Sequence, residues 1–226
     1  MAESKAKRKQ RALEIAKLLA KAYPDAECAL HHRSAFELLI ATVLSAQTTD
    51  EKVNEVTDDF FKTHNRPEHF ATEDLTKLEQ VLRPTGFYHN KTKSVIGASK
   101  MLLDDFGGEV PRTMEELIRL PGVSRKTASV VLGVAFGLAE GVVVDTHVAR
   151  IAVRLGLTPV QTTKTVSAEK IEKDLMELLP REEWINFSHR IIWHGRRVCT
   201  ARKPLHDQCV LEPLCPKIGT PEQRRL

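Results

Sequence analysis

The stretch Leu120-Pro-Gly-Val-Ser-Arg-Lys-Thr-Ala128, which runs straight into an apolar segment, decides how the middle of this chain folds. The Pro-Gly pair ends a preceding helix over Thr113–Leu120, and Ser124 is suited to cap the next one, so the stretch predicts a tight hairpin of two helices. Arg125 and Lys126 then fall in a first helical turn, where the helix dipole disfavours each cation by roughly 0.3–1 kcal/mol. We therefore expect an anion there, and a nucleic-acid phosphate fits.

Helical patterns dominate the rest of the chain and predict an all-α fold. The expected helices cover Arg11–Ala22, Phe36–Ala46, Thr72–Arg83, Lys91–Phe106, Ser129–Phe136, His147–Leu155, Ser167–Leu179 and Arg181–Trp193. Capping boxes predict helix starts at Ser34–Glu37, Thr48–Glu51 and Thr113–Glu116. The triplet Val142–Val144 suits a strand, but no similar run could pair with it, so we expect an extended connection.

Composition and charge restrict the class of protein. The chain has 226 residues, 42% of them apolar, and contains neither a secretory signal nor about 18 consecutive apolar residues, which predicts a cytoplasmic protein without membrane contact. The net charge is +4, and the excess of basic residues lies at the two ends of the chain. Residues 1–11 hold five Lys or Arg against one acid, and residues 190–226 hold eight against three. A solvated tail is one interpretation of the first run, but two basic ends together favour phosphate binding.

Three of the four cysteines lie close together near the C-terminus. With one histidine they form the pattern Cys199-x6-His206-x2-Cys209-x5-Cys215, in a short segment that contains two prolines. Such compact spacing of soft and borderline ligands is typical of a metal site. From the residues alone, three cysteines and a histidine suit a structural zinc ion as well as an iron–sulfur cluster.

Two motifs carry a resemblance to a known family. Leu-Pro-Gly-Val-x-Arg-Lys-Thr-Ala, followed by Val-Asp-Thr-His-Val-x-Arg at Val144–Arg150, resembles the helix-hairpin-helix and catalytic segments of the endonuclease III family of DNA glycosylase/AP lyases. The resemblance implies that Lys126 is the nucleophile and Asp145 its carboxylate partner. Ser124 stands where the family hairpin has a glycine. Asp145 also fits a second role as the cap of the helix that follows it.

The implied activity is excision of oxidised pyrimidines from duplex DNA, followed by cleavage of the strand in base excision repair. The lysine amine attacks the sugar C1′ and forms an imine, and β-elimination then breaks the 3′ C–O bond. An ammonium cannot attack, so we expect the helix N-terminus, Arg125 and partial burial to favour the neutral amine of Lys126. Asp145 would accept a proton or stabilise an oxocarbenium charge.

Base excision requires that the damaged base leave the helix. The resemblance implies that Gln47 fills the gap and that Phe87, where the family often has leucine, wedges beside the orphan base. A polar helix end is the alternative for Gln47. Further DNA contacts are expected from Gly122, Ser124, Arg125, Arg196 and Arg197. We expect a monomer that binds damaged double-stranded DNA.

The family pattern Cys-x6-Cys-x2-Cys-x5-Cys binds a [4Fe-4S] cluster, and His206 stands at its second cysteine. The favoured interpretation is a cluster held by Cys199, Cys209, Cys215 and the His206 imidazole. An open or water-bound fourth iron, a [3Fe-4S] cluster and zinc are the alternatives.

The resemblance also implies two helical lobes with DNA in the groove between them. Residues 28–139 would form a helical barrel domain with the hairpin, and residues 1–27 and 140–226 together an iron–sulfur domain. One alternative function is a non-catalytic helix-hairpin-helix DNA-binding protein stabilised by a metal. The presence of both Lys126 and Asp145 disfavours this alternative. Another is a purine-removing relative without lyase activity, which generally lacks this lysine.

Overall fold

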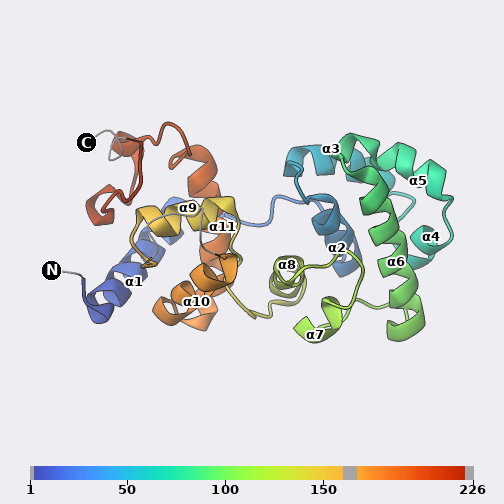
Figure 1. The fold of residues 1–226 in the computed structure, drawn as a ribbon, viewed down its shortest axis with the longest axis horizontal. Coiled ribbons are helices and arrows are strands. Elements are labelled where there is room, and N and C mark those ends of the chain that lie inside the picture. The colour runs from blue at the N-terminus through green and yellow to red at the C-terminus, as the bar shows by residue number, and fades with distance from the viewer. Residues whose placement is uncertain (1–2, 160–166, 222–226) are drawn as a thin grey trace. The chain divides into compact units, whose positions relative to one another are not determined.

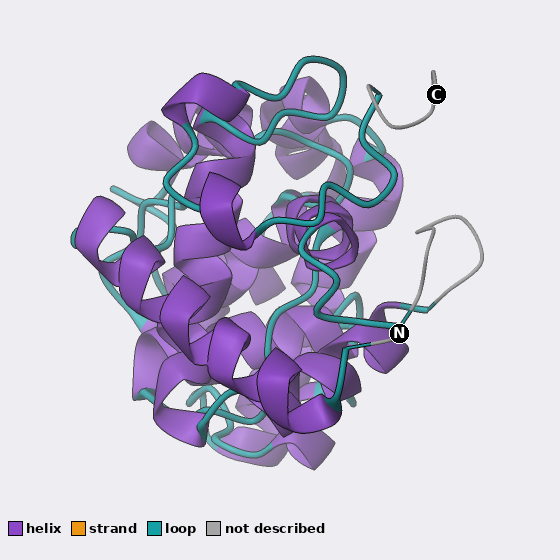
Figure 2. Ribbon diagram, turned by 90° about the vertical axis from the view of Figure 1, so that its left-hand side faces the viewer, coloured by secondary structure: helices purple, strands orange, loops and turns teal. Residues whose placement is uncertain are grey.

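The computed structural model describes residues 3–159 and 167–221 (Figure 1). Within these ranges every regular element is a helix and no strand occurs (Figure 2), so the all-α prediction is confirmed. The segment Val142–Val144 is an extended connection, as expected. The chain divides into two compact units, which we call the middle unit (residues 28–140) and the terminal unit (residues 1–27 and 141–226). Some of the residues assigned to the terminal unit lie outside the described ranges.

The middle unit is a set of helices around one apolar core. Its elements are α2 (Ala35–Leu44), α3 (Asp50–Phe60), α4 (Pro67–Ala71), α5 (Leu75–Leu82), the short 3-10 helix η1 (Arg83–Thr85), α6 (Tyr88–Phe106), α7 (Met114–Leu117) and α8 (Arg125–Phe136). Nine of the ten residues of α2 are buried, which explains why its sequence is apolar on nearly every side. The long helix α6 packs against α2, α4 and α5, and α8 packs against α2 (Figure 1).

The terminal unit joins both parts of the chain that flank the middle unit. Its elements are α1 (Lys5–Ala22), α9 (Thr146–Arg154), α10 (Ala168–Leu178), η2 (Arg181–Glu183), α11 (Trp184–Arg197), η3 (His206–Gln208) and η4 (Glu212–Leu214). Helix α11 packs against α9 and α1, and a second apolar core fills the space between these helices.

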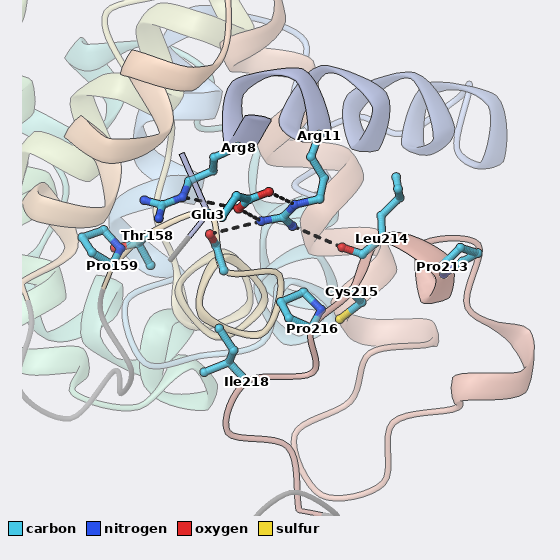
Figure 3. Close-up of a pocket in the computed structure, with 11 residues that line it drawn as sticks. Glu3, Arg8, Arg11, Thr158, Pro159, Pro213, Leu214, Cys215, Pro216 and Ile218 are labelled. Atoms are coloured by element: carbon cyan, nitrogen blue, oxygen red, sulfur yellow. Dashed lines mark hydrogen bonds and ion pairs between the residues drawn. The ribbon is translucent and has the colours of Figure 1, made fainter. Parts of the chain in front are cut away.

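One arginine of α1 links the two chain ends. The guanidinium of Arg11 donates a hydrogen bond to the carbonyl of Leu155. It also donates to the carbonyl of Leu214 and pairs with Glu3 at 2.6 Å (Figure 3). These contacts line a pocket that also includes Cys215. The C-terminal loop is therefore attached directly to the first helix and to the end of α9.

The structure corrects several helix boundaries. Helix α1 begins at Lys5, six residues before the predicted start, because Ser4 caps it. Helix α5 begins at Leu75 and not at Thr72, since the Asp74 side chain accepts from the Lys77 amide. The short helix α4 was not predicted. Helix α7 covers only part of the predicted Thr113–Leu120.

The helix cap predicted from the capping box at Thr48–Glu51 was wrong by one residue. Thr49, not Thr48, caps α3, and its hydroxyl accepts from the Lys52 amide at 3.3 Å. The Thr48 hydroxyl is bound instead to Thr85 and Lys91, which come from a distant part of the sequence. A tertiary contact therefore decides between two adjacent threonines that are equivalent in local sequence.

Candidate functional site

The predicted hairpin is formed by α7, a Pro-Gly turn and α8. Gly122 has φ of +79°, and a Cβ atom added to it would lie 2.6 Å from the Cβ of Ser94, so a larger residue does not fit without a shift. The Ser124 hydroxyl accepts from the Thr127 amide at 3.2 Å, which confirms Ser124 as the N-cap of α8. Ser124 thus satisfies one amide of this helix N-terminus without a charged side chain.

Lys126 lies in the first turn of α8, immediately after Arg125. Both side chains are exposed, and this turn contains no acidic residue. Lys126 makes no hydrogen bond or ion pair with any residue that the structure describes. The expected partial burial of Lys126 was wrong, because the core-facing positions of the turn are Thr127 and Ala128. The amine is therefore open to a ligand that approaches the helix N-terminus.

Asp145 is the N-cap of α9. One carboxylate oxygen, Oδ1, accepts from the amides of His147 and Val148, both at 2.8 Å. The other oxygen, Oδ2, makes no hydrogen bond within the described chain. The side chain is half-buried. Asp145 belongs to the terminal unit and Lys126 to the middle unit, and the structure describes each residue within its own unit.

Gln47 and Phe87 share two unusual features in the middle unit. Both have left-handed backbone conformations, with φ of 56° and 48°, although neither is glycine. Both side chains are exposed, and that of Phe87 is 64% exposed. A large aromatic ring so open to solvent is not part of a core, which makes it available to a binding partner. Gln47 follows α2 in a turn and is not part of the helix itself.

The four candidate metal ligands line one pocket at the end of the terminal unit. Cys199, His206, Cys209 and Cys215 share this pocket with Arg154. No group of three or more potential ligands in the described ranges converges on a position for one metal ion. Zinc requires four ligands around a single ion, whereas a cubane cluster spreads its ligands over four irons. The pocket therefore gathers the four side chains whose spacing the sequence singled out.

Charge around the pocket also fits an anionic cluster. The buried guanidinium of Arg154 donates to the Cys199 Sγ at 3.2 Å and to the Thr200 carbonyl at 2.7 Å. It forms no ion pair with a carboxylate in the described part of the chain. A nearby anion stabilises a buried cation, and a thiolate-bound cluster would supply one. Burial raises the pKa of the Cys209 and Cys215 thiols, so metal binding must displace their protons.

One further side chain at this site was missed in the sequence. His194 of α11 lies with its Nε2 3.5 Å from the Cys209 Sγ, and its Nδ1 is 2.9 Å from the Tyr23 hydroxyl. Burial lowers the pKa of His194 to about 4, so it is neutral at pH 7. The signal in the sequence was a histidine on the inward face of α11, three residues after the buried Ile191.

The basic residues of the two chain ends make different contacts. Arg196 and Arg197 are exposed at the C-terminal end of α11, and the guanidinium of Arg197 lies 4.1 Å from the centre of the Trp193 ring. The N-terminal run is part of α1, where Lys5 pairs with Glu177. Arg8 and Arg11 pair with Glu3. Three cations of the N-terminal run are thus paired with acidic residues of the same chain.

Comparison with known proteins identifies the family. The model of the HhH-GPD superfamily of base excision DNA repair proteins matches residues 40–181, more than half of the chain. The iron–sulfur binding domain of endonuclease III matches residues 199–215. Endonuclease III of Synechocystis sp. is 50% identical over 211 residues, which are 93% of this chain and 94% of that protein. The chain belongs to the endonuclease III family.

Other relatives agree with this assignment. Endonuclease III of Bacillus subtilis is 45% identical over 85% of this chain and 86% of its own. A non-covalent endonuclease III–DNA complex matches with a TM-score of 0.87 and 43% identity, over 96% of this chain and 99% of that one. The structure of a trapped endonuclease III–DNA covalent intermediate matches equally well. A thermostable thymine-DNA glycosylase, 20% identical with a TM-score of 0.81, shares the fold.

The protein is thus a bifunctional DNA glycosylase and AP lyase of base excision repair with an iron–sulfur binding region. The alternative of a non-catalytic DNA-binding protein was wrong. None of the helices in the described ranges has the length and apolar character needed to span a membrane.

Proposed function

We propose that this enzyme excises oxidised pyrimidines, such as thymine glycol, from damaged double-stranded DNA through an imine at Lys126. The observation that carries the proposal is the exposed Lys126 amine at the N-terminus of α8, which no described residue binds. Because Ser124 caps the helix, Lys126 is not needed for its stability. Its place directly after the hairpin suits a lysine that meets the sugar while the helix N-terminus meets a phosphate.

Lys126 is the only nucleophile that the protein needs to supply in this reaction. The neutral amine forms a bond to C1′, and the damaged base leaves with the electron pair of the glycosidic bond and takes up a proton. Opening of the sugar ring gives an imine at C1′. Loss of a proton from C2′ then expels the 3′ phosphate by β-elimination, and water releases the sugar fragment and regenerates the amine.

Asp145 is proposed as the carboxylate that accepts the lysine proton or stabilises positive charge on the sugar. Two amides occupy its Oδ1, while Oδ2 makes no hydrogen bond in the described chain, so one oxygen is open to such a role. Capping and catalysis are therefore compatible on one side chain.

DNA binding is proposed to involve both units. Gln47 and Phe87 would occupy the space left by the extruded base, which is supported by their exposure. Gly122, Ser124 and Arg125 would contact a phosphate at the hairpin, and Arg196 and Arg197 would contact the backbone elsewhere.

The proposed ligands of a [4Fe-4S] cluster are Cys199, His206, Cys209 and Cys215, supported by their shared pocket. When bound, the cluster supplies structural stabilisation and no reacting group. The His206 imidazole would bind the fourth iron. We further propose that the middle unit is a helical barrel domain, that the terminal unit is the iron–sulfur domain, and that the protein acts as a monomer in the cytoplasm.

A panel of duplexes that each carry one lesion tests the substrate class. We expect release of thymine glycol and related oxidised pyrimidines, with a 3′ product of β-elimination, and no release of oxidised or alkylated purines. Excision restricted to purines would contradict the proposal. Strand cleavage that follows base release only after alkali treatment would show that the imine step is absent.

A further inference from the structure

One buried cation in the middle unit has no role in the functions described so far. Lys91 lies in the first turn of α6 and is 5% exposed. It forms no ion pair with a carboxylate in the described ranges, and burial lowers its pKa. A cation is unfavourable both in a protein interior and at the positive end of a helix. Specific hydrogen bonds must therefore compensate for its position.

The hydrogen bonds of Lys91 connect two loops that are distant in the sequence. Its Nζ donates to the Thr48 Oγ1 and to the Thr85 carbonyl, both at 2.7 Å. The Thr48 hydroxyl donates in turn to the same Thr85 carbonyl. The three groups form a closed triangle, with Thr48 directly after Gln47 and Thr85 two residues before Phe87.

The triangle adjoins two strained backbone positions of the middle unit. In the described ranges only three residues other than glycine have positive φ, and Gln47 and Phe87 are two of them. Such conformations cost of order 1–3 kcal/mol and persist where neighbouring contacts enforce them. Strain beside a buried ammonium that binds both loops indicates that the backbone at Gln47 and Phe87 is fixed before any ligand binds.

Helix α6 also carries the contact surface of the hairpin. A Cβ atom at Gly122 would meet Ser94, and one at Gly97 would lie 3.1 Å from the Cγ of Pro121. Lys91, Ser94 and Gly97 follow at intervals of three residues along one side of α6. The two strained loops and the turn that precedes Lys126 are therefore held by one helix.

We propose that Lys91 is a positioning residue that holds Gln47 and Phe87 together as one preformed wedge for the DNA duplex. The proposal rests on the insertion of these two side chains proposed above. A wedge that is already ordered loses little conformational entropy when it enters the stack, so it lowers the cost of extruding a base. Lysine suits this role because its ammonium carries three donors and can bind two oxygen atoms at once.

Two variants remove the triangle in different ways. Thr48→Val keeps the shape of the side chain but removes the hydroxyl that links the Gln47 loop to Lys91. Lys91→Met removes the ammonium and keeps an unbranched chain of similar length. Thr57→Val is the matched control, since the Thr57 hydroxyl is also buried but donates only to the Val53 carbonyl within α3, at 3.0 Å.

The measurement compares two single-turnover rates for each variant. One is excision of thymine glycol from a duplex, which requires extrusion, and the other is cleavage at a preformed abasic site, which has no base to extrude. We expect Thr48→Val and Lys91→Met to lower the ratio of the first rate to the second by about tenfold, because a charge-assisted hydrogen bond is lost. Thr57→Val should leave the ratio unchanged.

A double-mutant cycle of Gln47→Ala and Phe87→Ala completes the test. In the native background the effects of the two truncations on excision should be coupled, and in the Thr48→Val background they should become additive. If neither truncation slows excision, the insertion proposed above is wrong and the wedge with it. If the truncations slow excision but Thr48→Val changes neither the ratio nor the coupling, Lys91 is not a positioning residue. Should Lys91→Met fail to fold, Thr48→Val alone decides.

Discussion

The two units of this chain hold their candidate functional groups in opposite ways. In the middle unit Gln47, Phe87 and Lys126 are exposed, and neighbouring residues provide the caps and contacts that stabilise the backbone. In the terminal unit the candidate groups are also structural: Asp145 caps α9, and Cys199 is bound by Arg154. Function and stability should therefore be separable by mutation in the middle unit and inseparable in much of the terminal unit.

The largest effect is expected at Lys126. Lys126→Gln should abolish the borohydride-trapped adduct with an abasic-site duplex, because no amine remains at the N-terminus of α8. The midpoint of thermal unfolding should be unchanged, since this exposed side chain makes no hydrogen bond or ion pair within the described chain. A large decrease in the stability of this variant would show that function and stability are not separable at Lys126.

For Asp145, in contrast to Lys126, we expect one side chain to contribute to both catalysis and stability. Asp145→Asn should slow base excision about 10²–10⁴-fold, the usual contribution of a catalytic acid or base, while the amide oxygen still caps α9. Asp145→Ala should show the same catalytic defect and also lower the free energy of unfolding by about 1 kcal/mol, because the cap is removed.

Ser124→Ala is the control for the cap in the middle unit. It should lower the free energy of unfolding by about 1 kcal/mol and still form the trapped adduct, because cap and nucleophile are different residues there. Equal stability of Asp145→Asn and Asp145→Ala in chemical denaturation would show that the cap contributes little.

A smaller and more selective effect is expected at Phe87. Phe87→Ala should slow excision of a stably paired lesion by about tenfold, the contribution of one stacked aromatic ring, and leave cleavage at an abasic site near the native rate. Single-turnover rates on the two substrates measure the difference. Equal decreases on both would indicate a packing role for a ring that is 64% exposed.

The smallest effect concerns the salt dependence of DNA binding. Reversal of charge at Arg196 and Arg197 should flatten the plot of log affinity against log salt concentration by roughly 0.9 for each phosphate that the protein no longer neutralises. Binding titrations at several salt concentrations measure this slope. An unchanged slope would remove this exposed pair from the DNA-binding surface.

The sequence predicted the elements that depend on local chemistry. Helical periodicity, the Pro-Gly turn and the Ser124 cap need only neighbouring residues, and all three are in the structure. The errors came from tertiary contacts. Thr48 was predicted at a helix start because the local sequence does not reveal its hydrogen bond with Lys91. Lys126 was predicted to be partly buried, but which side of the first turn of α8 faces the core depends on tertiary packing, and Lys126 is exposed.

Only part of the candidate functional site could be predicted from the sequence. The metal-ligand spacing and the lysine and aspartate motifs stand out because they are short and contiguous. Arg154 and His194, which contact the cysteines, lie in ordinary amphipathic helices and become recognisable only when α9 and α11 pack beside the loop. The role of His206 as a cluster ligand stays a prediction, for which metal analysis and spectroscopy of the purified protein are the direct tests.

The central claim is that the Lys126 amine forms the covalent bond to DNA. Borohydride reduction of the native enzyme with an abasic-site duplex, followed by proteolysis and mass spectrometry, locates that bond. We expect one adduct, on the peptide that contains Lys126. An adduct on another lysine or on the N-terminal amine, with Lys126 unmodified, would contradict it.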